Sequence, residues 1–241
     1  MEYSGEDFSR LIRSRRSIRD FSPKPIPQEL LDTILEDAKW SPSGSNTQPY
    51  FLAIATGKKK DRITSALIEH YKEALKILKG GRVRKLYAKV TGRGMPDGDF
   101  DTSFTYPMPL KKYRQETGYG LYKVLGIKRE DKAARERQWM RNYEFFGAPV
   151  VIFIFVHEDL GAYSVLDAGI FLQSLMLSAH AHGLGSCAQG ALATWGSPVR
   201  AEFTIPDKYK LIVGISLGYP TDAQVNSFSP GRRDLEITSG E

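Results

Sequence analysis

An unbroken apolar run at residues 149–156, Pro-Val-Val-Ile-Phe-Ile-Phe-Val, constrains the fold more than any other segment. Its β-branched and aromatic side chains, with no polar alternation, predict a central strand that is buried on both faces. Residues 163–182 follow with a helical pattern that is apolar nearly all round. Such a helix must be buried inside the domain or at a subunit interface.

The remaining patterns alternate between helix and strand. Prolines 23, 25 and 27 exclude a helix after an extended segment at residues 17–21, and residues 80–110 are the least regular region. These features predict a mixed α and β domain, although periodicity alone leaves the strand pairing open. Helices are expected at residues 8–14, 28–40, 58–79, 111–125, 130–146, 163–182 and 195–203, and strands at residues 50–56, 149–156 and 210–217.

Composition narrows the functional classes. With 241 residues, of which 41% are apolar, the chain can bury a large core in one large domain or two small ones. The longest apolar run is too short to span a membrane. The single cysteine, Cys187, excludes an internal disulfide and a multi-cysteine zinc site, and we expect no metal. Acidic residues precede any apolar stretch, so we expect a cytoplasmic protein.

The net charge of +6 is unevenly distributed. Residues 58–141 carry 22 basic and 10 acidic residues, a local net charge of +12, whereas the rest of the chain has a net charge of −6. A basic segment suggests nucleic-acid binding, but no helix-turn-helix, zinc-finger or RNA-recognition motif accompanies it. A solvated helical surface is the favoured interpretation, and an electrostatic funnel for small anions is the other alternative.

Four arginines, Arg13, Arg15, Arg16 and Arg19, surround Ser17 at a predicted helix-to-strand junction. In an extended segment Arg15, Ser17 and Arg19 share one face, and their guanidinium and hydroxyl groups suit a phosphate or carboxylate. Composition alone favours the alternative that they are surface residues covering a helix end.

The predicted loop at residues 41–49, Ser-Pro-Ser-Gly-Ser-Asn-Thr-Gln-Pro, consists of turn-forming and small polar residues. Its amides and hydroxyls could bind the polar edge of a planar heterocycle, although such turns are common.

Residues 183–188, Gly-Leu-Gly-Ser-Cys-Ala, fit the form G-x-G-x-x-A. A dinucleotide fingerprint follows a strand and opens a helix, but this segment ends one, so we reject a Rossmann site. We expect Gly183 at the helix C′ position and residues 186–190 as an exposed ribbon. Cys187 is expected to be an inert thiol, and spacing disfavours a metal site at His180 and His182.

No Ser-His-Asp order, paired-carboxylate motif or P-loop is present. An anion site with amide-rich loops and no acid–base residues of its own is the pattern expected when a cofactor carries the chemistry.

The chain resembles the nitroreductase family, whose members are flavin enzymes that use NAD(P)H. The resemblance covers about residues 10–79 and 141–235, and it is closest to the nitrobenzoate-reductase-like branch. It rests on the order and spacing of Arg15-Arg-Ser-Ile-Arg-Asp-Phe21, residues 42–49, Phe146-Gly-Ala-Pro149, residues 167–185 and Gly218-Tyr-Pro220.

The resemblance implies an FMN site. The FMN phosphate and pyrimidine edge would be held by Arg15, Arg16, Ser17, Arg19 and one of Arg232 and Arg233. The loop that would reach FMN from the other subunit consists of Pro42, Ser43, Gly44, Ser45, Asn46 and Gln48. The strip beside the flavin N5 edge would consist of Ala188, Gln189 and Gly190, and Asn142 would bond to the ring.

The resemblance also implies a single α+β domain over residues 1–241, with a mixed sheet flanked by helices and residues 80–140 as a basic lid. Family members are intertwined homodimers, which would give the tail residues Phe228, Leu235 and Ile237 a partner to pack on. The implied activity is ping-pong reduction of nitroaromatic, quinone or similar acceptors by NAD(P)H, without a catalytic side chain. The alternatives are reductive dehalogenation, flavin cleavage and nucleic-acid binding.

Overall fold

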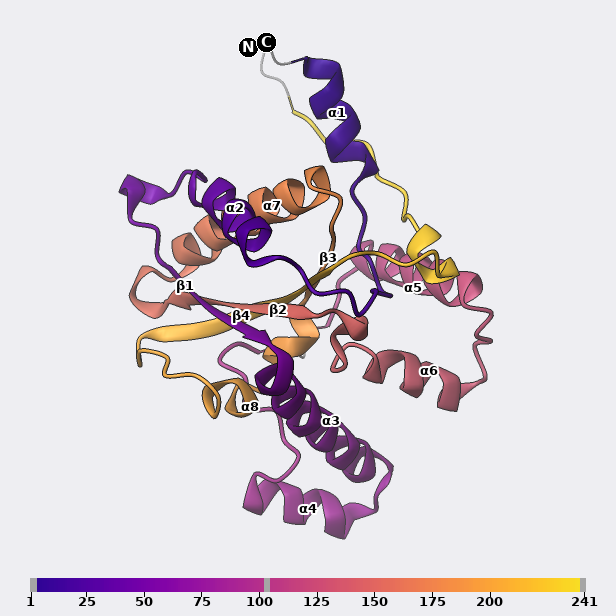
Figure 1. Cartoon of the computed structure of the whole chain (residues 1–241). Coiled ribbons are helices and arrows are strands. Elements are labelled where there is room, and N and C mark those ends of the chain that lie inside the picture. Colours follow the sequence, from indigo (N-terminus) through magenta and orange to yellow (C-terminus); the bar gives the residue numbers. More distant parts are fainter. Residues whose placement is uncertain (1–3, 102–104, 239–241) are drawn as a thin grey trace.

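A four-stranded antiparallel sheet forms the centre of the computed structural model, which describes residues 4–101 and 105–238. Its strand order is β1 (Tyr50–Thr56), β2 (Val150–His157), β4 (Tyr209–Gly218) and β3 (Gly185–Gln189), so the last strand in sequence lies inside the sheet (Figure 1). The expected mixed sheet is therefore wrong. Within the described part of the chain, the parallel pairing is confined to the isolated bridge between Ser17 and Ser186.

β2 is buried along residues 150–156, which confirms the strand predicted from the apolar run. Its side chains alternate between two cores: Val151, Phe153 and Phe155 belong to one, and Ile152 and Ile154 to the other. Because both faces are covered, a polar side chain at any position of β2 would lose its hydration.

Helices cover both faces of the sheet. On one face, α2 (Gln28–Lys39) and α7 (Ala162–Ala181) pack their apolar sides on Ile152 and Ile154. On the other, α3 (Gly57–Lys79) packs Ile63 and Leu67 against Phe153, near the short helix α8 (Ser197–Arg200). α2 and α8 lie within the predicted ranges, and α3 and α7 each begin one residue earlier than predicted.

α7 is only half covered by this chain. Phe171 and Leu175 are buried against the sheet, whereas Tyr163 is 75% and Leu166 57% exposed. The helix has the length and the mean hydropathy, 1.3, of a membrane span, but buried core helices can have the same length and hydropathy. Its outer apolar face lacks a partner among the described residues of the single chain.

Residues 80–140 contain more helix than predicted. α4 (Arg82–Thr91) lies where an irregular segment was expected, and α5 (Leu110–Val124) and α6 (Lys132–Met140) follow it. Residues 102–104 of the expected lid lie outside the described residues. α6 ends six residues before the predicted boundary, because Phe145 and Phe146 adopt positive φ values of 52° and 54° and turn into the core.

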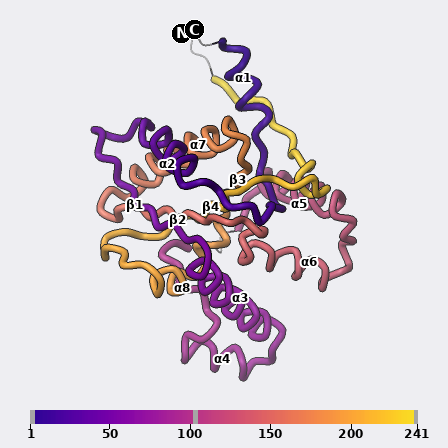
Figure 2. The backbone as a smooth tube through the Cα atoms, in the orientation of Figure 1, coloured from indigo at the N-terminus to yellow at the C-terminus, as the bar shows by residue number. Residues whose placement is uncertain are grey.

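The two ends of the chain run side by side away from the sheet, the C-terminal tail beside α1 (Gly5–Ser14) (Figures 1 and 2). Phe228 is buried against α5, where a Cβ on Gly120 would lie 2.9 Å from its ring. The prediction that the tail packs on something is confirmed for Phe228. Leu235 and Ile237 remain 83% and 77% exposed.

Candidate functional site

The arginine-rich segment at residues 15–19 is attached to the outer edge of β3. The Ile18 N–H donates to the Ser186 carbonyl oxygen at 3.0 Å, and Ser17 forms a parallel bridge with Ser186. Ile18 is 8% exposed, so it is the buried side chain of the segment. In an extended chain its neighbours Ser17 and Arg19 then point away from the core.

Asn226, in the turn after β4, joins this segment to the tail. Its Oδ1 accepts the backbone N–H groups of Arg19 and Asp20 at 2.8 and 3.1 Å. Its Nδ2 donates to the carbonyl oxygens of Asp20 and Thr221 at 2.8 and 3.0 Å. Three of the four bonds of this buried amide therefore fix the backbone of Arg19 and Asp20, and the fourth binds it to Thr221 after β4.

Arg15 lies close enough to Arg232 for the two like charges to repel. Partial burial, and secondarily the Arg232 guanidinium, lower the pKa of Arg15. Within the described residues, no carboxylate forms an ion pair with Arg15, Arg16, Arg19 or Arg232. The acid in the segment, Asp20, is bound by Arg141 at 3.1 Å. Two converging guanidiniums without an acid are the charge arrangement of an anion site.

The side chains of Arg232 and Arg233 contact different parts of the structure. Arg233 lies over the Tyr113 ring of α5, with its Cζ 4.1 Å from the ring centroid. Arg232 donates to the carbonyl oxygens of Pro230 and Gly231 and is the tail arginine that acts on Arg15.

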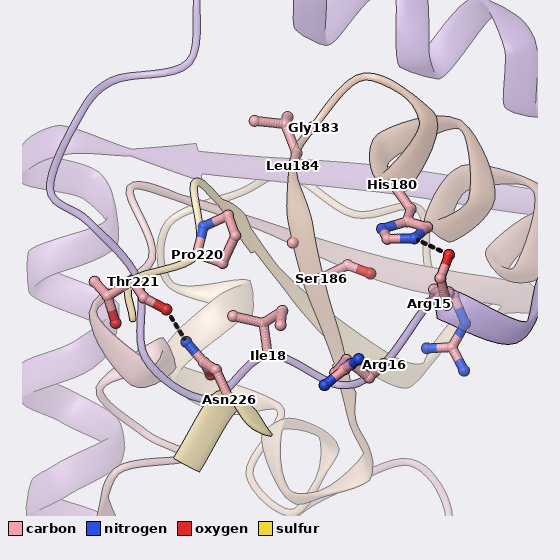
Figure 3. A pocket seen from close by; sticks show the side chains of 12 residues that line it. Arg15, Arg16, Ile18, His180, Gly183, Leu184, Ser186, Pro220, Thr221 and Asn226 are labelled. Carbon is pink, nitrogen blue, oxygen red and sulfur yellow. Dashed lines mark hydrogen bonds between the residues drawn. The ribbon is translucent and has the colours of Figure 1, made fainter. Parts of the chain in front are cut away.

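A cavity of about 400 Å³ lies between the end of α1 and the end of α7, lined by Arg15, Arg16, Gly183 and Ser186 among others (Figure 3). In it, His180 Nε2 lies 2.8 Å from the Ser14 hydroxyl. Burial, and then the charges of Arg15 and Arg16, lower the pKa of His180. Gly183 has φ +77°, as expected for the C′ position of α7.

A larger cavity of about 950 Å³ lies beside α5 and α6, and Arg19, Asn142 and Phe146 line it. This volume is typical of a ligand or cofactor site. Asn142 is held by two neighbours: its Nδ2 donates to the Trp139 carbonyl at 2.8 Å, and Gln189 Nε2 donates to its carbonyl at 3.0 Å. Gln189 Oε1 in turn accepts the Ser216 hydroxyl.

The segment expected as an exposed ribbon is instead the strand β3. Gln189 is 4% exposed and points into the fold, but Ala188 and Gly190 are exposed. Cys187 is buried, and burial raises the pKa of its thiol to about 11, which fits an inert thiol.

Residues 42–48 lie at the other end of α2 from the arginine segment, at the left of Figure 1. The Gly44 N–H donates to both carboxylate oxygens of Asp167 at 3.2 Å, and the Gln48 N–H donates to the Ser43 hydroxyl at 3.0 Å. Three exposed residues of this loop have positive φ values, which is a strained conformation typical of functional loops. These are Ser45, Asn46 and Gln48, at 49°, 55° and 47°.

The single chain thus brings the predicted arginines close together, but the predicted loop lies apart from them. Arg15 and Arg16 share the smaller cavity, Arg19 and Asn142 share the larger one, and Arg232 lies near Arg15. The loop residues Pro42, Ser43, Gly44, Ser45, Asn46 and Gln48 lie apart from all of these (Figure 1).

Three buried polar residues that position the site were missed by the sequence analysis: Asn226, Ser216 and Asp167. Each acts through backbone or amide groups that are distant in sequence, and no local spacing marks it. Within the described ranges, no group of three or more His, Cys, Asp or Glu side chains could hold a metal ion.

Comparison with known proteins places this geometry in a family context. The sequence model of the nitroreductase family matches residues 12–219. The 4-nitrobenzoate reductase of Nocardioides sp. is 34% identical over 220 residues, covering 91% of this chain and 82% of the relative. The 4-nitrobenzoate reductase of Pseudomonas putida is 34% identical over 243 residues, covering 98% of this chain and 94% of the relative.

A solved structure agrees over the whole fold. The FMN-dependent nitroreductase NfnB from Mycobacterium smegmatis, in complex with NADPH, superposes with a TM-score of 0.82 at 31% identity, covering 97% of this chain and 99% of that chain.

Proposed function

The chain belongs to the nitroreductase family, and we propose that it is an FMN-dependent oxidoreductase that uses NADPH to reduce nitroaromatic acceptors. The observation that carries the proposal is the arginine segment, where Arg15 and Arg16 line one cavity without an ion pair to a carboxylate of the described chain, and where Arg232 lies close enough to repel Arg15. They lie where a cofactor phosphate would relieve that repulsion. The residues present therefore fit FMN.

Other residues would hold the rest of the cofactor. Arg19 and Asn142 line the larger cavity beside the arginine segment, and they would contact the ring system. Ala188 in β3 and Gly190 directly after it are exposed, so their N–H groups could reach the ring edge. When bound, FMN supplies hydride transfer between NADPH and the acceptor.

The protein's own contribution is orientation and electrostatics. Gln189 and Trp139 hold Asn142 in place, so its side chain is oriented before a ligand enters. Phe146 gives the cavity an apolar wall that excludes water from that side. Arg15 and Arg16 would favour the negative charge of the phosphate, and Arg19 would favour negative charge on the ligand in the larger cavity.

The proposal includes a homodimer. The strained loop at residues 42–48 lies at the other end of α2 from the arginines of its own chain (Figure 1) and lines neither of the cavities that they line. The outer face of α7, with Tyr163 and Leu166, and the tail residues Leu235 and Ile237 need apolar cover. A two-fold dimer could supply both, with each loop reaching the partner's flavin.

The proposal also includes a lid over the site and a cellular location. Residues 80–140 would form the lid over the site within one domain spanning residues 1–241. A cytoplasmic location agrees with the lone free thiol of Cys187.

The test is a visible absorption spectrum of the purified protein, followed by anaerobic titration with NADPH and then 4-nitrobenzoate. The proposal predicts one bound FMN per chain, bleaching by NADPH and recovery of colour with the nitro compound. A colourless protein that remains empty after incubation with FMN would contradict it. Bleaching without reoxidation by any nitro compound would favour dehalogenation or flavin cleavage instead.

A further inference from the structure

The larger cavity is lined by cations and by no acid. Among its lining residues within the described chain, neither aspartate nor glutamate occurs. The positive charges come from the arginine segment, from α5 and α6, and from the turn between these helices. They are Arg19, Arg114, Lys123, Lys128, Arg129 and Arg135.

The acids of the same helices are engaged elsewhere. Glu116 of α5 lies 4.0 Å from Lys112, Glu136 of α6 binds Lys79 at 2.6 Å, and Asp131 accepts the Ala134 N–H at 2.9 Å as the N-cap of α6. The helices thus separate their charges, with the acids turned away from the cavity and the cations around it. This arrangement leaves a positive field in the cavity.

Two of these arginines are held in place by tyrosines. The Arg129 Cζ lies 5.6 Å from the Tyr119 ring centroid, and the Arg135 Cζ lies 5.5 Å from that of Tyr122. Arg135 Nη1 also donates to the Arg129 carbonyl oxygen at 3.2 Å. A guanidinium stacked on a ring keeps its N–H edges available, and it can bind a carboxylate or phosphate with two parallel hydrogen bonds.

Two large aromatic side chains that line the same cavity are exposed to solvent. Tyr119 is 48% and Trp139 47% exposed, and both line it. Exposed aromatic side chains beside guanidiniums that form no ion pair with a carboxylate of the described chain match a planar ring that carries an anionic group. The proposed FMN phosphate is held elsewhere, because Arg15 and Arg232 do not line this cavity.

We propose that Arg129 and Arg135 form an anion subsite that binds the carboxylate or phosphate of a planar aromatic ligand, whose ring contacts Tyr119 and Trp139. This inference rests on the proposed function, since Asn142 in the same cavity would contact the flavin. The anionic group can belong to the acceptor, as in an aromatic carboxylate, or to the nucleotide donor. Arg129 and Arg135 are therefore specificity-determining residues, and they leave the chemistry of neutral acceptors unchanged.

The test uses the double variant R129Q/R135Q in the FMN-loaded protein, with R137Q as the matched control. Arg137 lies on the same helix and is exposed, but it does not line the cavity. Rates are measured with 4-nitrobenzoate and with nitrobenzene at fixed NADPH, and then with NADPH and NADH at fixed nitrobenzene. Binding of benzoate to the oxidised protein, followed by calorimetry, gives a readout that does not depend on turnover.

Losing charge-assisted hydrogen bonds should lower kcat/KM for the anionic ligand by about 10-fold or more. Loss confined to 4-nitrobenzoate, with weaker benzoate binding, assigns the subsite to the acceptor. Loss confined to NADPH relative to NADH assigns it to the donor's additional phosphate. R137Q should behave as wild type throughout.

The inference is overturned if R129Q/R135Q changes neither the ratio of kcat/KM for 4-nitrobenzoate to that for nitrobenzene nor the ratio for NADPH to that for NADH. Retained nitrobenzene reduction shows that the variant is folded. If wild-type protein reduces no nitro compound, the proposed function fails, whereas the benzoate titration still tests the subsite.

Discussion

The Oδ1 atom of Asn226 accepts the backbone N–H of Arg19 at 2.8 Å, between residues 207 positions apart in the sequence. Together with the bonds from Asn226 to Asp20 and Thr221, it holds the arginine segment against the turn that follows β4. An amide whose hydrogen bonds all go to backbone groups thus determines where the Arg19 backbone lies.

Replacing Asn226 with alanine should weaken FMN binding although no phosphate contact is removed. Backbone groups of Arg19 and Asp20 would lose their buried partner, at a cost of about 1–3 kcal/mol. Fluorescence titration with FMN measures the effect, and Gln224→Ala, an exposed neighbour in the same turn, is the control. Equal affinity in both variants would show that the segment is held without Asn226.

Changing Arg15 or Arg19 to alanine should weaken FMN binding by about 1.5–3 kcal/mol each, as expected for a charge-assisted hydrogen bond. Riboflavin lacks the phosphate, so it should lose much less than FMN in the Arg15 variant. In the Arg19 variant the two ligands should lose similar affinity, because Arg19 lines the cavity that would hold the ring. Calorimetric titration of each variant with both ligands makes the comparison. If riboflavin and FMN lose the same affinity in the Arg15 variant, Arg15 does not contact phosphate.

A chain truncated after Pro220 should lose FMN and the dimer together. The deletion removes Asn226, Phe228 and Arg232, which bind the arginine segment, α5 and the neighbourhood of Arg15. Because ligand and partner both stabilise the native state, their losses are coupled. Sizing chromatography with absorbance detection checks this outcome, and a flavin-loaded monomer would refute it.

The stability of the protein should decrease in alkali partly through Cys187. Burial raises the pKa of its thiol from 9.0 to about 11. The folded state therefore holds this proton more tightly than the unfolded state. The resulting contribution to the free energy of unfolding is complete below pH 9 and disappears as the pH approaches about 11. Denaturant unfolding across this window should show a smaller decline for Cys187→Ala than for wild type.

The basic segment at residues 58–141 should steer anionic substrates toward the site. Electrostatic steering raises association rates by roughly 10-fold or more at low salt, and it fades as the Debye length shortens. kcat/KM for 4-nitrobenzoate should therefore fall with ionic strength, while that for nitrobenzene should hardly change. The same salt dependence for both acceptors would indicate that the basic surface is only solvated.

Local patterns predicted most helices and strands because the signal is in neighbouring residues. The apolar run at residues 149–156 located β2, and the turn formers at residues 41–49 located the loop after α2. α4 was missed because the glycines and prolines around it conceal a short helix. The end of α6 was misplaced because buried Phe145 and Phe146 leave the helix to reach the core.

Distant contacts could not be predicted in the same way. Nothing in the spacing of Asn226 shows that it binds Arg19, or that Asp167 holds the loop through Gly44. The choice between Arg232 and Arg233 also depended on the fold, which turns Arg233 toward Tyr113. The antiparallel sheet likewise follows from strand order, which periodicity does not encode.

The position of β4 has a consequence for how the protein is made. β4 is synthesised after all the other strands, yet it pairs with β2 on one side and with β3 on the other. Until residue 218 leaves the ribosome, β2 has an open edge and uncovered apolar side chains, which invite association with other chains. Folding must then form non-local contacts in one late step, which is intrinsically slow. The growing chain should therefore depend on chaperones that shield residues 150–157 during synthesis.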